Sequence, residues 1–310
     1  MMKTDKTIAV ITPVSHLDGV VELLKSKGNV FLYETANKLK VKQALLKHQI
    51  NTIVCNPNQQ TYKIDEELLG GTKVTLINSC STGLNHIDVN YCNDNNIKIQ
   101  CHKDDYELIN QLPSTSELAF GLMLSLLRKI PHSQEHVSKY NWDYTQFMGR
   151  QIKDLKIGII GYGRLGKIMG EYCKAFGAKI FIYDPYVNVP QISLNQMFQE
   201  CDVISLHVHV TDETKYMINK KLLGLSQKDL YIINTSRGEI VNELDVVNAL
   251  NTGKLTGYGT DVIENEFDDI TKSPIIKAIN KGENIIVTPH IGGMTIEGQT
   301  KAYKWSINKL

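Results

Sequence analysis

Residues 155–185 read LKIGIIGYGRLGKIMGEYCKAFGAKIFIYDP and combine an apolar strand pattern, a turn with three glycines, a helical pattern and an acidic residue. Apolar residues precede the glycines, and others then recur at helical spacing as far as Phe176. A second apolar run, 179–183, ends directly before Asp184. This order of strand, glycine turn, helix and strand predicts a unit that binds a dinucleotide.

Each glycine of the turn has its own expected role. Gly161 allows a tight turn out of the strand, Gly163 allows the backbone to approach a pyrophosphate, and Gly166 allows the helix to pack closely on the sheet. The backbone N–H groups of Arg164 and Leu165 then lie at the helix N-terminus, where the helix dipole favours an anion. We therefore expect these five residues to contact the cofactor.

The acidic residue of the unit indicates which cofactor binds. Asp184 follows the second strand, about twenty residues after Gly161, where such units place an acid. Its carboxylate can accept hydrogen bonds from both ribose hydroxyls and would repel a 2′-phosphate. The sequence therefore predicts NAD rather than NADP.

Composition excludes several classes of protein. The chain has 34 Lys and Arg against 33 Asp and Glu, a formal net charge of +1, with no long block of one sign, which argues against nucleic acid as a partner. Its six cysteines form no Cys-x-x-Cys pair, which is typical of reduced cytosolic thiols and indicates no metal site. The longest apolar run, 118–127, is too short to span a bilayer. We expect a soluble, cytoplasmic protein.

Short apolar runs alternate with helical patterns along the chain, and 310 residues suffice for two domains. The runs are Ile8–Ile11, Val30–Tyr33, Thr52–Cys55, Val74–Asn78 and Ile97–Cys101, and then Val203–Val210, Leu230–Asn234, Thr256–Val262 and Ile285–Thr288. A helical stretch, 114–129, joins the two halves. The predicted fold is α/β, with two Rossmann-like, doubly wound parallel-sheet domains and a cleft between them.

Three ionisable side chains follow late strands of the second predicted sheet, at the edge where such sheets bind ligands: Arg237, Glu266 and His290. Singly, each has an ordinary structural explanation, as a turn residue, an exposed acid or a histidine after a strand. Together, downstream of a dinucleotide unit, they are the anion binder, orienting group and acid that a redox site needs.

These side chains suit the reduction of a 2-keto acid. Arginine binds a carboxylate at two points and can polarise the neighbouring carbonyl. Histidine can donate a proton to the nascent alkoxide and accept it in the reverse reaction. A carboxylate beside the histidine holds the ring and favours its protonated form. The pattern predicts these roles for Arg237, His290 and Glu266, respectively.

At these residues the chain resembles the D-isomer-specific 2-hydroxyacid dehydrogenases, a family that includes phosphoglycerate dehydrogenase and glyoxylate/hydroxypyruvate reductase. The segments that carry the resemblance are 81–88, 114–130, 147–149, 161–166, 206–219, 234–241, 257–266 and 288–299. The resemblance implies an NAD-dependent oxidoreductase in which Arg237, Glu266 and His290 are the catalytic residues.

The resemblance also assigns further binding residues. It implies that backbone N–H groups of Thr82 and Gly83 meet the substrate carboxylate. It makes Asp261 the partner of the nicotinamide amide. The other residues that it places along the cofactor are Val208, Thr235, Ser236, Gly292 and Gly293.

The family architecture implies the domain boundaries. Residues 1–102, completed by 291–310, form the substrate domain, and 103–290 form the NAD-binding domain. Within the latter, the segment at about 114–149 resembles the arm through which the family forms dimers, so a homodimer is expected. The chemistry is expected in the cleft between the domains.

The loop after the third predicted strand bears on the substrate side chain. Some family members carry a basic residue in the loop after the third strand, but here residues 55–60 read CNPNQQ, amide-rich and uncharged. Asn56 is the expected substrate contact of this loop, and its amide suits a hydroxylated or neutral polar group. The predicted subgroup is phosphoglycerate dehydrogenase-like. The alternatives are a glyoxylate/hydroxypyruvate reductase and a non-enzymatic, NAD-sensing corepressor.

Overall fold

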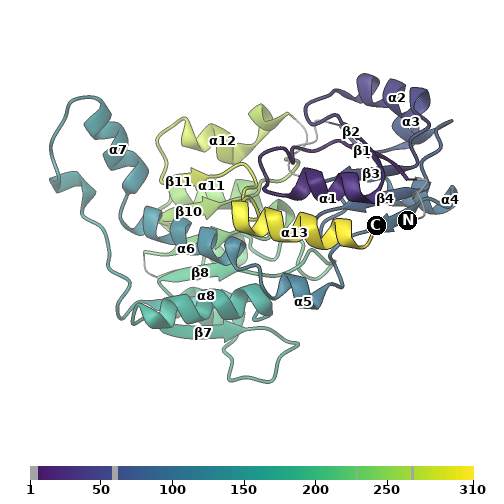
Figure 1. The fold of residues 1–310 in the computed structure, drawn as a ribbon. Coiled ribbons are helices and arrows are strands. Elements are labelled where there is room, and N and C mark those ends of the chain that lie inside the picture. The colour runs from purple at the N-terminus through teal and green to yellow at the C-terminus, as the bar shows by residue number, and fades with distance from the viewer. Residues whose placement is uncertain (1–5, 58–61, 228, 267–268) are drawn as a thin grey trace. The chain divides into compact units, whose positions relative to one another are not determined.

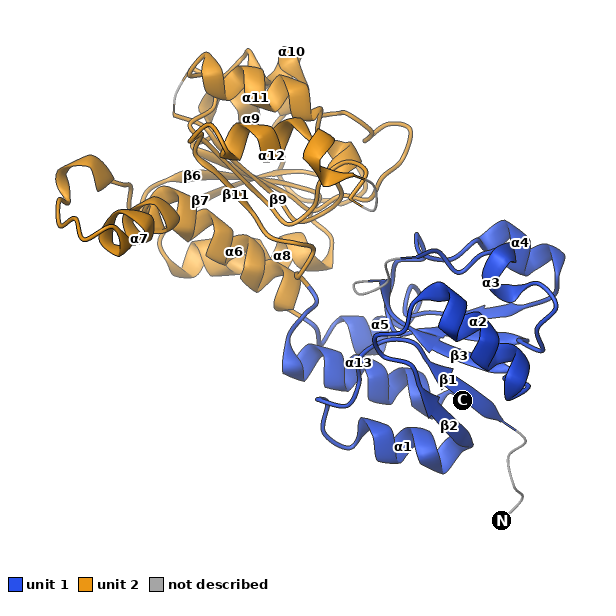
Figure 2. Ribbon diagram, turned by 90° about the horizontal axis from the view of Figure 1, so that it is seen from above, with its two compact units in different colours: residues 1–112, 293–310 blue, residues 113–292 orange. Residues whose placement is uncertain are grey.

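Two parallel sheets, each flanked by helices, organise the chain (Figure 1). The computed structural model describes residues 6–57, 62–227, 229–266 and 269–310. The chain divides into two compact units (Figure 2). Unit 1 comprises residues up to Leu112 together with Gly293–Leu310, and unit 2 comprises Pro113–Gly292.

Unit 1 contains a five-stranded parallel sheet in the order β2-β1-β3-β4-β5. Its strands are β1 (Thr7–Val10), β2 (Asn29–Leu32), β3 (Thr52–Cys55), β4 (Leu76–Ser79) and β5 (Lys98–Gln100). Its helices are α1 (Val20–Lys27), α2 (Lys38–Lys47), α3 (Glu66–Leu69), α4 (Val89–Asp94), α5 (Tyr106–Ile109) and α13 (Ile296–Asn308). The predicted strand 74–78 thus begins two residues later, at Leu76.

Alternate residues of β1 point to opposite faces of this sheet, and each face has its own core. Ala9 belongs to a cluster with residues of α2, α3 and α4. Ile8 and Val10 belong to a second cluster, with α1 and with Tyr303 and Ile307 of α13. The C-terminal helix therefore completes unit 1 by covering one face of its sheet.

Unit 2 contains a six-stranded parallel sheet in the order β11-β10-β9-β8-β6-β7. Its strands are β6 (Lys156–Ile160), β7 (Lys179–Tyr183), β8 (Val203–Leu206), β9 (Tyr231–Asn234), β10 (Gly257–Thr260) and β11 (Ile285–Val287). Its helices are α6 (Ser114–Leu127), α7 (Ile130–Ser138), α8 (Arg164–Ala175), α9 (Leu194–Glu200), α10 (Lys220–Leu223), α11 (Glu243–Asn251) and α12 (Pro274–Ile279). Because all six strands are parallel, their carboxyl ends share one edge.

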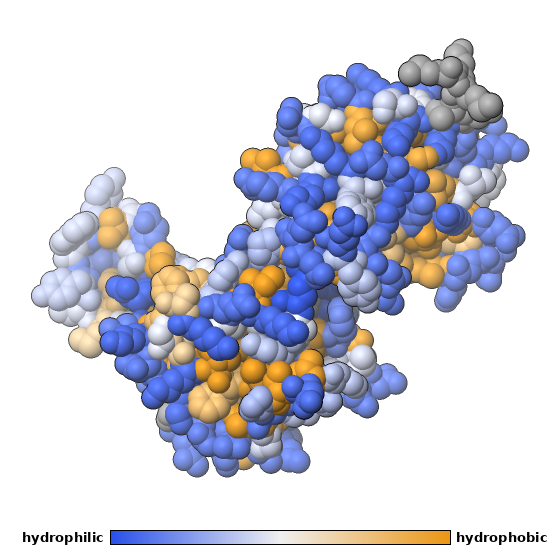
Figure 3. Space-filling view, turned by 60° about the horizontal axis from the view of Figure 1, so that its bottom comes forward, coloured by the Kyte–Doolittle hydropathy of each residue, from blue (hydrophilic) through white to orange (hydrophobic). Residues whose placement is uncertain are grey.

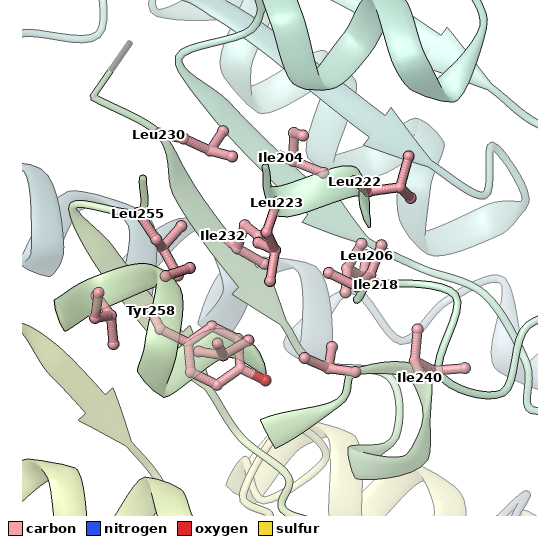
Figure 4. Packing of buried hydrophobic residues seen from close by; sticks show 14 of the residues in the cluster. Ile204, Leu206, Ile218, Leu222, Leu223, Leu230, Ile232, Ile240, Leu255 and Tyr258 are labelled. Atoms are coloured by element: carbon pink, nitrogen blue, oxygen red, sulfur yellow. The ribbon is translucent and has the colours of Figure 1, made fainter. Parts of the chain in front are cut away.

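Helices cover both faces of this sheet too. One face packs against α6 and α8, with Ile157 and Ile159 in the cluster. The other packs against α9 to α12, and Figure 4 shows Ile204, Ile232 and Tyr258 among the buried residues there. Ile204 and Ile232 are fully buried. Burial of one such side chain stabilises a fold by roughly 1.5–3 kcal/mol, so these two cores fix the frame that carries the strand ends.

The two parallel α/β sheets confirm the predicted fold class. The bounds of individual strands differ from the predicted ones. The run 203–210 forms a strand only to Leu206, because its partners Ile160 and Asn234 are the last residues of β6 and β9. A parallel strand ends where its neighbours stop supplying hydrogen bonds, so the apolar residues beyond it lie in the loop at the sheet edge.

Of the predicted arm, about 114–149, the first part forms α6 and packs in the core of unit 2. The segment 130–149, hereafter the arm, projects from the rest of unit 2 (Figure 1). Its helix, α7, has no buried residue. Figure 3 shows the arm as a lobe on the left, with apolar and weakly polar residues among hydrophilic ones. Its exposed large apolar side chains are Ile130, Val137, Tyr140, Trp142, Tyr144 and Met148.

No described helix is long and apolar enough to cross a membrane.

Candidate active site

The glycine turn lies where β6 ends, between β7 and β8, the point at which successive strands change sides in the sheet. Such a switch point is where open α/β sheets bind ligands. Gly161 has a φ of +87°, and a Cβ there would lie 2.5 Å from the carbonyl oxygen of His207 and 2.8 Å from a methyl carbon of Val208. Both facts restrict the position to glycine. They also place Val208 directly beside the turn.

The other two glycines shape the start of α8. A Cβ at Gly166 would lie 2.0 Å from the carbonyl oxygen of Gly161, so the helix can approach the turn only because this residue is glycine. A Cβ at Gly163, the N-cap residue of α8, would meet no atom within 4 Å. The backbone N–H groups of Arg164 and Leu165 come before the first helical hydrogen bond, which Lys167 donates to Gly163. Open space beside a helix N-terminus fits a pyrophosphate.

Asp184 follows β7 and fixes the turn from the side. One carboxylate oxygen accepts the backbone N–H of Tyr162 at 2.7 Å, and the other accepts that of Tyr186 at 2.9 Å. The side chain is 9% exposed. Each carboxylate oxygen can accept more than one hydrogen bond, so Asp184 keeps acceptor capacity for ribose hydroxyls.

His290 and Glu266 form the central pair of the site. The Nδ1 atom of His290 lies 2.9 Å from both Glu266 oxygens, Oε1 and Oε2. The two side chains are 30% and 18% exposed, respectively. This pairing fixes the orientation of the ring through Nδ1.

The backbone of His290 takes a φ of +54°, which is uncommon for a residue other than glycine. The N–H of His290 donates to the carbonyl oxygens of Asp261 and Thr288, both at 2.9 Å. Left-handed residues that the surrounding structure holds in place gather at functional sites. Here the left-handed turn fixes the direction in which the imidazole leaves the end of β11.

Asp261 holds the loop that follows His290. Its carboxylate accepts hydrogen bonds from the backbone N–H groups of Ile291 at 2.8 Å and Gly292 at 2.7 Å, and from the Thr288 hydroxyl at 2.5 Å. The side chain is 1% exposed, and desolvation raises the pKa of its carboxyl above the usual range. A Cβ at Gly292 would lie 3.0 Å from Asp261 Oδ2, which favours glycine there.

Arg237 follows β9 and is held by its own turn. Its Nη1 atom donates to the carbonyl oxygen of Ser236 at 2.7 Å. The buried Asn234 amide donates to the carbonyl oxygen of Arg237 at 2.9 Å, and its oxygen accepts the N–H of Ser236 at 3.0 Å. Thr235 and Ser236 are themselves buried, at 9% and 8% exposure. The guanidinium therefore leaves a rigid turn at the sheet edge.

The three expected catalytic residues thus follow three adjacent strands. Arg237 follows β9, Glu266 follows β10 and His290 follows β11, in the parallel order β11-β10-β9. The structure brings Glu266 into contact with His290. Among the described residues, no group of three or more His, Cys, Asp or Glu side chains could hold a metal ion.

The expected substrate contacts lie at the ends of two strands in unit 1. Asn56 follows β3, is 5% exposed and donates its amide to the carbonyl oxygen of Cys80 at 3.2 Å. Thr82 and Gly83 follow β4, in a turn where the Ser81 hydroxyl donates to the Gly83 carbonyl oxygen at 2.8 Å. The rest of the amide-rich loop, from Asn58, lies outside the described residues. Gly293 is the residue at which the chain returns to unit 1. Its carbonyl oxygen accepts a hydrogen bond from the side-chain amide of Gln299 at 3.1 Å.

Sequence reasoning missed two residues that hold this site together. Asn234, the last residue of β9, hydrogen-bonds both sides of the Arg237 turn. The backbone N–H of Tyr162, the middle residue of the glycine turn, contacts Asp184. The Asn-Thr-Ser-Arg run offered a signal for the first, because asparagine commonly bonds backbone two residues on. A backbone N–H leaves no mark in the sequence.

A family model matches the part of the chain that carries the glycine turn, Arg237, Glu266 and His290. Residues 120–292, more than half of the chain, match the family model described as "D-isomer specific 2-hydroxyacid dehydrogenase, NAD binding domain". The chain belongs to the D-isomer specific 2-hydroxyacid dehydrogenase family. The match confirms the predicted enzyme class, an oxidoreductase, and the predicted cofactor, NAD.

Curated relatives within the family differ in substrate. The chain is 31% identical over 238 residues to the hydroxypyruvate reductase of Thermotoga maritima, covering 74% of each chain. It is 29% identical over 301 residues to the D-3-phosphoglycerate dehydrogenase of Methanocaldococcus jannaschii, covering 94% of this chain and 54% of that protein. The chain thus spans about half the length of that phosphoglycerate dehydrogenase.

A solved structure of the family has the same architecture. The D-lactate dehydrogenase of Aquifex aeolicus, complexed with NAD and lactic acid, is 28% identical and aligns with a TM-score of 0.75 over 97% of this chain and 93% of that one. Three different substrates are therefore named among these similar 2-hydroxyacid dehydrogenases, and membership of the family leaves the choice of substrate open.

Proposed function

We propose that this chain interconverts a 2-keto acid and a D-2-hydroxy acid, with His290 as the acid and base, Glu266 as its orienting partner and Arg237 as the binder of the substrate carboxylate. The observation that carries the proposal is the pairing of His290 Nδ1 with both Glu266 oxygens at 2.9 Å. NAD, when bound, supplies or accepts the hydride. The chain itself must bind the acid, polarise its carbonyl group and move one proton.

In the direction of reduction, the Arg237 guanidinium holds the carboxylate at two points and draws electron density from the adjacent carbonyl. Protonated His290 gives its Nε2 proton to the carbonyl oxygen as negative charge develops there, which leaves a neutral ring. Glu266 stabilises the charged ring before this transfer. In the direction of oxidation, the neutral ring accepts the hydroxyl proton, and the same carboxylate stabilises the product imidazolium.

The remaining expected residues are proposed as the binding surface of the cofactor and the substrate. We assign the pyrophosphate to the turn 161–166 and the ribose to Asp184. The nicotinamide side is assigned to Thr235, Ser236, Asp261, Gly292 and Gly293, with Val208 along the cofactor. In the substrate domain, proposed as residues 1–102 with 291–310, Asn56, Thr82 and Gly83 are the substrate contacts.

Within this reaction class, two kinds of substrate are considered. The predicted phosphoglycerate dehydrogenase-like subgroup uses a phosphorylated acid, and the alternative is a hydroxypyruvate or glyoxylate reductase. One observation favours an unphosphorylated substrate: Asn56, which begins the loop after β3, is uncharged and buried. A phosphate needs a cationic or multiple-donor partner. We therefore give hydroxypyruvate equal standing with phosphohydroxypyruvate as the expected substrate.

NADH oxidation with a panel of 2-keto acids tests the proposed function. The panel contains glyoxylate, hydroxypyruvate, phosphohydroxypyruvate, pyruvate and 2-oxoglutarate, each also tested with NADPH. We expect turnover with NADH and at least one acid, and a strong preference for NADH because Asp184 repels a 2′-phosphate. NADH binding without turnover of any acid would favour the alternative, a cofactor-sensing corepressor.

We propose that the arm joins two copies of the chain in a homodimer. Tyr140 is 98%, Trp142 89% and Tyr144 85% exposed, and large exposed aromatic residues gathered on one segment mark an interaction surface. The double substitution Trp142→Asp with Tyr144→Asp should halve the mass measured by sedimentation equilibrium. The matched control is Tyr106→Asp, at a 66% exposed tyrosine of unit 1. Unchanged mass in the double variant would refute the assignment.

We also propose a cytoplasmic location. All six cysteines lie within the described residues and are free thiols, five of them buried. Free thiols persist in reducing compartments and become oxidised outside them. Cell fractionation with an antibody to the chain should find it with cytosolic markers.

A further inference from the structure

A buried glutamate, Glu243, contacts the segment that carries Glu266. Glu243 is the first residue of α11 and is 5% exposed. Its position at a helix N-terminus favours a negative charge. Burial raises the pKa of its carboxyl, and hydrogen bonds from Glu264 and Ser273 act in the opposite direction. Burying a carboxylate costs free energy unless hydrogen bonds compensate the loss of water. The hydrogen-bond partners of Glu243 therefore indicate what the side chain does.

The two oxygens of Glu243 accept hydrogen bonds from residues on either side of Glu266. Oε1 accepts the backbone N–H of Glu264 at 2.8 Å, two residues before Glu266. Oε2 accepts the hydroxyl of Ser273 at 2.9 Å, seven residues after Glu266. The Ser273 hydroxyl also caps α12, accepting the N–H of Ile275 at 3.2 Å. One side chain thus contacts the chain both before and after Glu266.

The turn that carries Arg237 lies just before α11, and Arg237 is six residues before Glu243. The backbone of Gly238 packs so closely on the Glu266 segment that a Cβ there would lie 2.2 Å from the nitrogen of Glu264. A second link comes from Tyr216, whose N–H donates to the Glu239 carbonyl oxygen at 2.8 Å and whose hydroxyl donates to the Glu264 carboxylate. The Arg237 turn and the chain at Glu264, two residues before Glu266, are therefore fixed relative to each other.

An amide could not accept both of these hydrogen bonds. Glutamine of the same shape has one acceptor oxygen, and its NH2 group would face either the Glu264 N–H or the Ser273 hydroxyl oxygen. Facing the N–H, it would leave a buried donor unpaired. Facing Ser273, it could donate to the hydroxyl oxygen, but the hydroxyl proton would lose its carboxylate acceptor. Either loss costs roughly 1–3 kcal/mol, so the substitution would weaken the contact at Glu264 or at Ser273 and change few other contacts.

We propose that Glu243 is a positioning residue for catalysis, which fixes Glu266 against His290 and the Arg237 turn by binding Glu264 and Ser273 on either side of it. The inference rests on the proposed function, because it matters only if Glu266 orients a catalytic histidine. Glu243 touches no reacting atom in this account and acts only through Glu266.

A double-mutant cycle tests the inference. Glu243→Gln, Glu266→Gln and the double variant are compared with wild type for kcat, KM and the pH dependence of kcat/KM, using the best 2-keto acid of the panel. We expect Glu243→Gln to lower kcat by about tenfold to a hundredfold, as loss of precise placement does. In the Glu266→Gln background it should change kcat less than about twofold, because coupled residues are not additive.

Two controls separate positioning from a general loss of stability. Glu239→Gln changes a half-buried glutamate of the same turn and should leave kcat at the wild-type level. Ser273→Ala removes only one of the two bonds to Glu243, so it should fold even if Glu243→Gln does not. It should lower kcat severalfold in the wild-type background alone. NADH affinity should stay within about twofold in all variants.

The outcomes distinguish this inference from the proposed function. Wild-type kcat and pH dependence in Glu243→Gln and Ser273→Ala, with a large loss in Glu266→Gln, would overturn the positioning role and leave the proposed function standing. An equal loss from Glu243→Gln in both backgrounds would indicate a structural role and also overturn it. Wild-type kcat in Glu266→Gln would overturn both.

Discussion

Replacing His290 by alanine should lower kcat for 2-keto acid reduction by about a hundredfold to ten-thousandfold, the range that a positioned proton donor contributes. NADH affinity should change little, because the side chain pairs with Glu266 through Nδ1 and acts through Nε2. Steady-state kinetics with the best acid of the panel, together with NADH titration by fluorescence, measures both quantities.

The control for this prediction is His132→Ala, at a histidine of α7 in the arm. It should keep wild-type kcat and NADH affinity. A His290→Ala variant that is folded and binds NADH but retains wild-type kcat would remove His290 from the mechanism. The carboxylate of Glu266 would then have no catalytic role in this account.

Replacing Arg237 by lysine should lower kcat/KM by about tenfold to several hundredfold. One hydrogen bond to a charged group contributes roughly 1.5–3 kcal/mol, and lysine cannot reproduce the two-point geometry of the guanidinium. KM should rise because carboxylate binding weakens, and kcat should fall because the carbonyl is less polarised. Initial rates over a range of acid concentrations separate the two effects.

Arg128→Lys, at the C-cap of α6, is the matched control and should leave both constants unchanged. The Arg237 variant should still bind NADH, because the bonds of Asn234 to the Arg237 turn involve backbone atoms and survive the substitution. A change in NADH affinity with unaltered KM for the acid would place Arg237 at the cofactor instead of the substrate.

The sequence predicted the fold class and the order of the elements well. Parallel strands buried on both faces appear as continuous apolar runs, and nine such runs contain nine of the observed strands wholly or in large part. It predicted strand limits less well. Val208 and Val210 extend the apolar pattern of the strand before them, but the pairing with β6 and β9 ends at Leu206. Pairing between strands distant in sequence sets that limit.

The sequence predicted the expected catalytic residues, but it did not predict the contacts that hold them in place. Residue type and strand-end position suffice to select Arg237, Glu266 and His290. The contact from Glu243 to Glu264 and Ser273 spans about twenty to thirty residues and follows no periodic pattern. The left-handed backbone of His290 is accompanied by a hydrogen bond from its N–H to the Asp261 carbonyl oxygen, which only the folded strands bring close.

Hydride transfer is the central claim, and isotope transfer tests it most directly. NADH carrying deuterium at the transferable position of C4 is incubated with the enzyme and the best 2-keto acid, and the product is analysed by mass spectrometry and chiral chromatography. The account predicts one deuterium at C2 of a D-2-hydroxy acid. An L product, or a 2-hydroxy acid without deuterium while NADH is consumed, would contradict it.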